Sequence, residues 1–139
     1  MNSKIKLSIC VATYNNKDYI AQALDSFLMQ KTNFKFQIIV GDDCSTDGTT
    51  DILKEYAKKY PDIIKPIFRE KNIGRDRNLL ATNALDIYSN AKTPYIAMCD
   101  GDDYWIDENK LQKQVDFLET HPDYSICFHP VKVVYEGFD

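Results

Sequence analysis

The sequence predicts an α/β domain with a mainly parallel sheet and helices on both faces. Short runs of apolar residues alternate with longer segments in which apolar residues recur at the helical spacing. Clusters of aspartates follow the second and the fourth of the expected strands. Because ligands bind at the carboxyl ends of the strands in open α/β sheets, this placement of acidic residues favours the same class of fold.

The expected strands are short apolar runs bounded by turn residues. The first begins with alternating polar and apolar residues and then becomes almost wholly apolar, which is typical of a strand that enters a sheet covered on both faces. In chain order, these segments are Ile5–Ala12, Phe36–Val40, Ile63–Phe68, Tyr95–Cys99 and Ser125–Val134.

The expected helices lie between these strands, so that strand and helix alternate along the whole chain. Each has one apolar face, and a proline follows the second and the fourth helix, where it ends the helical pattern. The predicted segments are Ile20–Leu28, Thr49–Tyr60, Leu80–Tyr88 and Asp107–His121. This order of elements predicts parallel strands joined by right-handed crossovers.

Composition excludes several classes of protein. The chain has 139 residues and a formal net charge of −4, and its basic residues are spread along the sequence, unlike those of a nucleic-acid-binding domain. The N-terminus lacks the apolar core of a signal peptide and there is no long apolar run, so the protein is expected in the cytoplasm. The cysteines are far apart, without metal-ligand spacing, and are expected to be small buried side chains.

The segment Cys99–Trp105, with the sequence Cys-Asp-Gly-Asp-Asp-Tyr-Trp, directly follows the fourth expected strand. Asp100 and Asp102 are two residues apart, so in extended backbone their side chains point to the same side. Gly101 between them allows a ligand to approach the backbone closely. Paired carboxylates without histidine or cysteine suit Mn²⁺ or Mg²⁺, which take their remaining ligands from water and phosphate oxygens.

A second acidic cluster follows the second strand. Ser45, Thr46 and Asp47 are good N-cap residues, so helix capping explains this part of the cluster. Capping does not explain the adjacent carboxylates of Asp42 and Asp43, and we expect at least one of them to bind a ligand. A carboxylate only accepts hydrogen bonds, so it would hold a base that presents an N–H group, as uracil, thymine and guanine do.

Other nucleotide-binding candidates lie near the expected rim. Arg75 and Arg77 stand at the start of the third helix, where basic residues are unfavourable unless an anion such as a diphosphate is near. The alternative is a solvated pair of arginines balanced by Glu70 and Asp76. Tyr14, just past the first strand, is the aromatic residue expected beside a nucleobase.

Several alternative sites are excluded by counting. A calcium-binding loop that began at Asp43 would need a glutamate at its twelfth position, which is Lys54. A loop that began at Asp100 would have Trp105 where glycine is required. The first strand runs into Thr13–Asn16 and not into a glycine-rich phosphate loop, so dinucleotide oxidoreductases and phosphate-loop ATPases lose their defining element.

Four segments in this order carry a family resemblance. They are Ser8–Asn15, Ile39–Gly48, Lys71–Gly74 with Asn78, and Tyr95–Trp105. Together they resemble the donor half of a GT-A-fold glycosyltransferase, and the best match is the large inverting family 2 of polysaccharide-building enzymes. The resemblance covers nearly the whole chain and implies a Rossmann-like GT-A domain.

The resemblance implies a role for individual residues. In that family the D-x-D motif holds Mn²⁺ or Mg²⁺ and the diphosphate, which by position makes Asp102 the metal ligand and places Asp100 beside the ribose and the metal. Asp43 matches the acidic residue that contacts the base. The contacts of the first strand fall on Ala12, Thr13 and Tyr14, where Ala12 replaces a commoner proline.

The resemblance also implies an activity. It is metal-dependent transfer of a sugar, with inversion, from a nucleoside-diphosphate donor, UDP by preference, to a saccharide or lipid-linked acceptor in polysaccharide or cell-envelope glycan synthesis. Peripheral association with the inner face of the membrane would follow.

Residues 1–139 are expected to be the donor-binding part of a truncated domain, without its acceptor part, and the catalytic base is expected C-terminal to Asp139. A non-catalytic nucleotide-sugar-binding module remains an alternative. So does a structural α/β domain whose acidic turns only cap helices.

Overall fold

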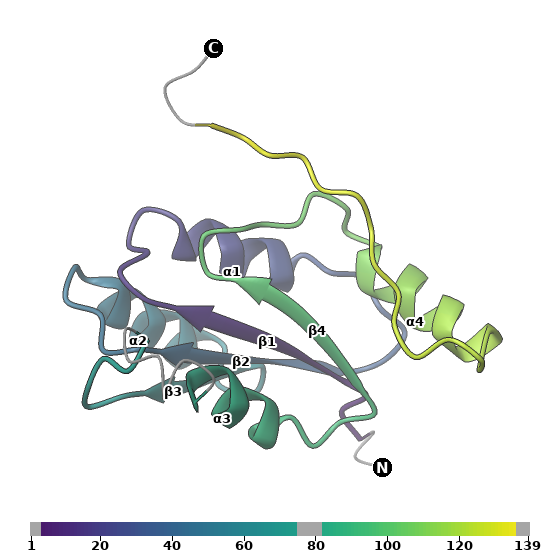
Figure 1. The fold of residues 1–139 in the computed structure, drawn as a ribbon, viewed down its shortest axis with the longest axis horizontal. Helices are drawn as coiled ribbons and strands as arrows, with labels where there is room; N and C mark the ends of the chain where they lie inside the picture. Colours follow the sequence, from purple (N-terminus) through teal and green to yellow (C-terminus); the bar gives the residue numbers. More distant parts are fainter. Residues whose placement is uncertain (1–3, 75–81, 136–139) are drawn as a thin grey trace.

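The protein forms one parallel sheet that carries helices on both faces (Figure 1). The computed structural model describes residues 4–74 and 82–135. The strands are β1 (Leu7–Thr13), β2 (Phe36–Asp42), β3 (Ile64–Phe68) and β4 (Tyr95–Asp100). Their order across the sheet is β3-β2-β1-β4, and every pair is parallel, so the predicted α/β class is confirmed.

The helices are α1 (Ile20–Leu28), α2 (Thr49–Lys59), α3 (Thr82–Asn90) and α4 (Lys110–Thr120). The first, second and fourth pack on one face of the sheet, in a core that includes Leu24, Leu53 and Val115. Helix α3 covers the other face, where Ile87 packs against Cys10 and Ile39. Among the described helices, none is both long enough and apolar enough to cross a bilayer.

Strand β1 is the centre of the sheet, with β2 on one side and β4 on the other. Its alternate residues face the two helical layers: Ile9 and Val11 belong to the larger core, and Cys10 belongs to the smaller one. Because both faces are covered, the strand is apolar at nearly every position. The exceptions are the buried Ser8 and Thr13, and the Ser8 hydroxyl is satisfied by the side chain of Gln37, whose Nε2 donates to it over 2.9 Å.

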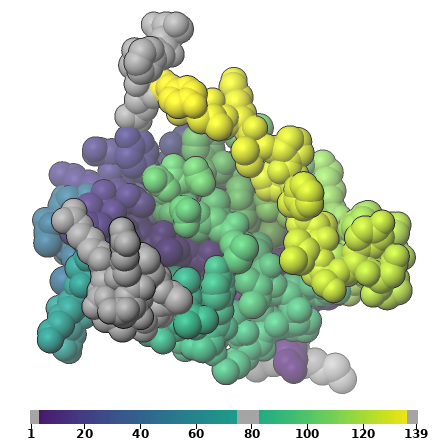
Figure 2. All heavy atoms as spheres, in the orientation of Figure 1, coloured from purple at the N-terminus to yellow at the C-terminus, as the bar shows by residue number. Residues whose placement is uncertain are grey.

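The prediction of a fifth strand at Ser125–Val134 is wrong. Residues 125–135 form no strand, and their apolar side chains are exposed: Ile126 retains 76% and Phe128 92% of its accessible surface. In Figure 2 this segment lies on the outside of the molecule. The residues of Ser125–Val134 are strand-like and predicted a strand, but a strand also needs a neighbour to pair with. Among the described residues, β4 pairs only with β1.

Candidate functional site

The acidic turns meet at the carboxyl edge of the sheet. In the register of the strands, Thr13 at the end of β1 is opposite Asp42, and Ala12 is opposite Asp100. Two backbone hydrogen bonds continue this arrangement beyond the strands: the Asp43 N–H donates to the Thr13 carbonyl, and the Gly101 N–H donates to the Ala12 carbonyl, each over 3.0 Å. The two clusters therefore flank the end of β1 on one rim, as expected for a ligand site in such a sheet.

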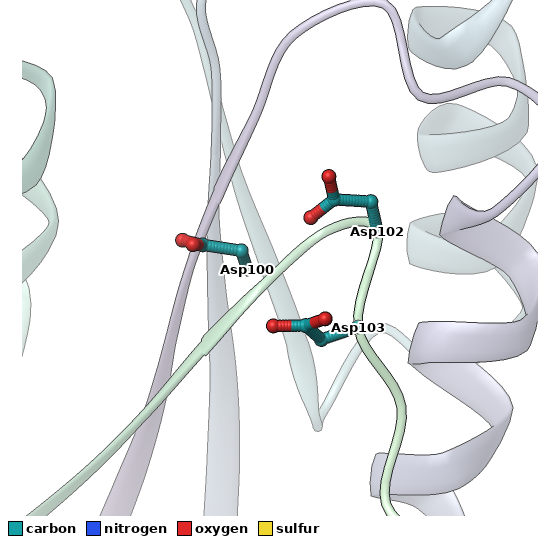
Figure 3. A group of neighbouring side chains, drawn as sticks. All are labelled: Asp100, Asp102 and Asp103. Atoms are coloured by element: carbon teal, nitrogen blue, oxygen red, sulfur yellow. The ribbon is translucent and has the colours of Figure 1, made fainter. Parts of the chain in front are cut away.

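A group of three carboxylates stands at the end of β4. One oxygen from each of Asp100, Asp102 and Asp103 lies within 4.8 Å of the other two, and all three residues are exposed. Figure 3 shows the carboxylates on the same side of the turn. The Asp103 N–H donates to the Asp100 carbonyl over 3.2 Å, so the chain turns back after Gly101 and brings Asp103 into the group. Asp103 was not among the metal ligands expected from the sequence, although it directly follows Asp102.

The electrostatics of this group favour a cation. Burial first, and then the neighbouring charges of Asp102 and Asp103, raise the pKa of Asp100. A divalent cation among the three carboxylates would offset this repulsion, and a set of carboxylate oxygens is what Mn²⁺ and Mg²⁺ prefer. Because the carboxylates are exposed, coordination positions remain for water and phosphate oxygens. The residues present therefore fit the expected metal.

Thr13 lies directly beneath this turn and carries an unusual hydroxyl. The residue is 4% exposed, and its Oγ1 has no hydrogen-bond partner among the residues that the structure describes. A Cβ atom added to Gly101 would stand 2.6 Å from that oxygen, so only glycine fits above it. Buried polar atoms without a partner are rare, and they are found at functional sites more often than elsewhere.

Asp42 is part of the turn's own framework. Its side chain is almost fully buried, with 1% exposure. Its carboxylate accepts hydrogen bonds from the backbone N–H and hydroxyl of Ser45 and from the hydroxyl of Thr50. A direct contact between Asp42 and a nucleotide would have to compete with these three donors.

Asp43 connects the rim to the loop after β3. Its carboxylate accepts the backbone N–H groups of Ile73 and Gly74 over 2.9 and 2.7 Å, and its carbonyl accepts the side-chain amide of Asn72 over 3.0 Å. A carboxylate has about four acceptor positions, so two remain after these bonds, and the residue itself is 4% exposed. Gly74 is also required for space, since an added Cβ would lie 2.8 Å from the Asp43 carboxylate.

The other predicted residues divide into two groups. Ala12 and Thr13 end β1 between the acidic turns, and Tyr14 follows them with 38% exposure, which leaves its ring accessible at the rim. Arg75 and Arg77 lie outside the described residues, so their role with a diphosphate stays a prediction.

This combination of a parallel sheet and an acidic rim defines a class: an α/β domain with carboxylates gathered at the carboxyl edge of its strands, where such sheets bind ligands. The model of the glycosyl transferase family 2 matches residues 8–139. The chain therefore belongs to glycosyl transferase family 2, as the resemblance of its motifs implied.

Relatives and solved structures agree with this family. The chain is 47% identical over 130 residues to the uncharacterized protein Rv1520 of Mycobacterium tuberculosis, covering 94% of this chain and 36% of that protein. It is 40% identical over 114 residues to WfaP of Escherichia coli, a UDP-Glc:alpha-D-GlcNAc-diphosphoundecaprenol beta-1,3-glucosyltransferase, covering 82% of this chain and 41% of that enzyme.

A solved structure shows the same fold. The chain superposes on S. aureus TarS 1-349 in complex with UDP-GlcNAc with a TM-score of 0.70 and 30% identity, covering 85% of this chain and 32% of that one. The chain thus spans well under half the length of these proteins.

Proposed function

We propose that this chain binds the donor for a metal-dependent glycosyl transfer, in which a sugar passes from a nucleoside diphosphate to an acceptor hydroxyl with inversion at the anomeric carbon. The observation that carries the proposal is the shared rim: the carboxylate group at the end of β4 and the buried Asp43 flank the end of β1. A cation site and an acceptor for a base N–H then stand on opposite sides of one strand end.

Each side of the rim has its own task in this proposal. Asp102, Asp100 and Asp103 would hold Mn²⁺ or Mg²⁺, and the metal when bound would neutralise the negative charge on the departing diphosphate. Asp43 would accept the N–H of the base, and the exposed ring of Tyr14 would lie against its face. The backbone of Ala12 and Thr13 would form the floor between them. A base that takes the acceptor's proton is also required, and the proposal gives that role to none of the described residues.

The proposed donor is a UDP-sugar. Uracil presents an N–H at its edge, whereas adenine presents a lone pair at the equivalent ring nitrogen, which a carboxylate would repel. The related TarS was solved with UDP-GlcNAc, and the name of the related WfaP specifies UDP-Glc as donor and a diphosphoundecaprenol-linked acceptor. We extend the proposal on this ground to a saccharide or lipid-linked acceptor in cell-envelope glycan synthesis.

Calorimetric titration of the protein with UDP and with ADP, with and without Mn²⁺, tests the proposal. We expect UDP to bind more tightly than ADP, and to bind more tightly with Mn²⁺ than without it. Asp102→Asn should weaken Mn²⁺-dependent UDP binding about tenfold or more, which corresponds to the loss of about 1.4 kcal/mol. Asp123→Asn is the matched control, because it removes the same charge from an exposed turn after α4.

Two results would count against it. If Asp102→Asn binds UDP in Mn²⁺ with wild-type affinity, Asp102 is not the metal ligand. If the protein binds UDP and ADP with equal affinity, Asp43 does not recognise the base. With a UDP-sugar and a transferable acceptor, the configuration of the product at its anomeric carbon, read by proton NMR, distinguishes inversion from retention.

A further inference from the structure

The loops that follow β1 and β2 are joined by reciprocal hydrogen bonds. The Asn15 N–H donates to the Ser45 hydroxyl oxygen over 2.9 Å, and the Thr46 N–H donates to the Asn15 side-chain oxygen over 2.8 Å. Each loop thus gives one backbone N–H to a side chain of the other. We call these three residues, Asn15, Ser45 and Thr46, the loop clasp.

A second pair of bonds extends the connection. The Asn16 N–H donates to the Thr49 hydroxyl over 2.9 Å, and the Lys17 N–H donates to the Asp47 carboxylate over 3.0 Å. Partial burial by itself raises the pKa of Asp47, but the hydrogen bonds from Thr49 and Lys17 outweigh it and lower this pKa below its usual value. The hydrogen bonds that connect the two loops at this point are therefore accepted by the ionised form of the Asp47 carboxylate.

The clasp stands where the backbone turns sharply. Asn15 has φ of 52° and Cys44 has φ of 63°, and among the described residues these are the positive values outside glycine. Asn15 directly follows Tyr14, and Cys44 directly follows Asp43. A left-handed residue is uncommon, and it persists only where surrounding contacts hold it. In both loops it lies immediately after a residue that our proposed function places beside the base.

The buried Asp42 sets the orientation of the clasp. The Ser45 hydroxyl has one proton and donates it to the Asp42 carboxylate, so its lone pairs are left to accept the Asn15 N–H. The Thr50 hydroxyl donates to the other Asp42 oxygen and holds the carboxylate in place. Because Asp42 is only 1% exposed, it influences the rim by orienting Ser45 and not by contact with a ligand.

We propose that Asn15 and Ser45 are positioning residues for base recognition, and that Asp42 acts through Ser45. The clasp holds the loop of Tyr14 against the loop of Asp43, so that the ring and the carboxylate keep a constant separation that fits the edge and face of a pyrimidine. This inference rests on the proposed function, because it assumes that a base lies between the two loops.

The test uses two pairs of variants. Ser45→Ala removes the hydroxyl, whereas Ser45→Thr keeps it. Asn15→Gly permits the left-handed backbone but lacks the acceptor for the Thr46 N–H, whereas Asn15→Asp keeps an acceptor there and tolerates the same φ. For each variant, calorimetry gives the dissociation constants of UDP and ADP in Mn²⁺, and of Mn²⁺ alone, and urea unfolding gives the stability.

We expect Ser45→Ala and Asn15→Gly to bind UDP about tenfold more weakly, because the two loops would then have to be ordered when UDP binds. Their preference for UDP over ADP should fall as well, which a loss of stability alone would not cause. Ser45→Thr and Asn15→Asp should retain most of the affinity. The affinity for Mn²⁺ alone should not change, because the carboxylate group lies on the other side of β1.

Each contrary result has its own meaning. If the wild type binds no UDP in Mn²⁺, the proposed function fails and this inference fails with it. If the wild type binds UDP but Ser45→Ala keeps the same affinity and preference, the inference is overturned and the proposed function stands. A parallel loss of Mn²⁺ affinity would also overturn it. If Ser45→Ala does not fold, the asparagine pair decides, and equal UDP binding by Asn15→Gly and Asn15→Asp would overturn the inference.

Discussion

The hydroxyl of Thr13 is buried, and it forms no hydrogen bond in the described structure that would replace those it makes with water in the unfolded chain. Among the described residues it has no hydrogen-bond partner, and Gly101 covers it so closely that an added Cβ would lie 2.6 Å away. Removing a hydroxyl from water without a new hydrogen bond opposes folding. A residue that lowers stability at the centre of a rim is a candidate for a part in ligand binding, because a ligand or an ordered water can supply the missing partner.

Thr13→Val tests this at the scale of a single residue. Valine has nearly the same shape, so it removes the hydroxyl without leaving a cavity. We expect the free energy of unfolding to rise by about 1 kcal/mol, the lower end of the cost of a buried unsatisfied polar group. Urea denaturation measures the change, and Thr13→Ser, which keeps the hydroxyl, serves as the comparison. A loss of stability in Thr13→Val would mean that the hydroxyl has a partner in solution.

At the scale of elements, α1 holds the chain that follows the acidic turn. The Ser26 hydroxyl accepts the Trp105 N–H over 3.0 Å, and Gln30 at the end of this helix binds the start of α4. The Gln30 side chain donates to the Asp107 carbonyl over 2.8 Å and accepts the Leu111 N–H over 3.0 Å. The chain from Trp105 to α4 is thereby fixed on both sides, and the acidic turn is anchored at its C-terminal end.

Gln30→Leu should break this anchor. The leucine has a similar volume but leaves the buried Leu111 N–H without its partner, whereas the Asp107 carbonyl keeps the N–H of Lys110. We expect the free energy of unfolding to fall by about 2 kcal/mol, since each buried group left unsatisfied costs about 1–3 kcal/mol. The control is Gln22→Leu on the exposed side of α1, which should change stability by less than about 0.5 kcal/mol. Equal urea midpoints for the two variants would contradict the anchoring role.

For the molecule as a whole, the carboxylate group links stability to both metal and pH. Burial, and after it repulsion from Asp102 and Asp103, raises the pKa of Asp100 above its usual 3.8. In the metal-free protein, this group contributes stability when protonated, and the contribution is lost as the pH rises through the raised pKa. A bound cation reverses this pH dependence of stability, because it binds the ionised carboxylates and stabilises the folded state that holds them.

We therefore expect Mn²⁺ to raise the melting temperature at neutral pH, and to raise it further when UDP is added. The Mn²⁺-induced shift should shrink as the pH falls through the raised pKa of Asp100, which lies at higher pH than that of an ordinary aspartate. Differential scanning fluorimetry across a pH series measures it. Asp102→Asn should reduce the shift at every pH. If the Mn²⁺-induced change in melting temperature does not depend on pH, the cation binds at another site.

The positions of the strands and helices followed from local pattern. Apolar runs placed β1 to β4 to within a few residues. The central strands β1 and β2 are buried on both faces and are therefore mostly apolar, whereas alternate residues of β4 are exposed. The same reasoning failed for Ser125–Val134, whose residues are strand-like but which pairs with none of the described strands. Pairing depends on a neighbour supplied by another part of a chain, and no local pattern contains that information.

The candidate site divides in the same way. The sequence was enough to show which carboxylates follow the strands, and therefore that Asp43 and Asp102 share one edge, because parallel strands all present their carboxyl ends together. Three features depend on how the chain packs: Asp42 is buried against Ser45 and Thr50, Asp103 joins the carboxylate group, and Asn15 connects the loops after β1 and β2. These facts depend on which side chains meet after the strands pair, and residues far apart in the chain meet only when it folds.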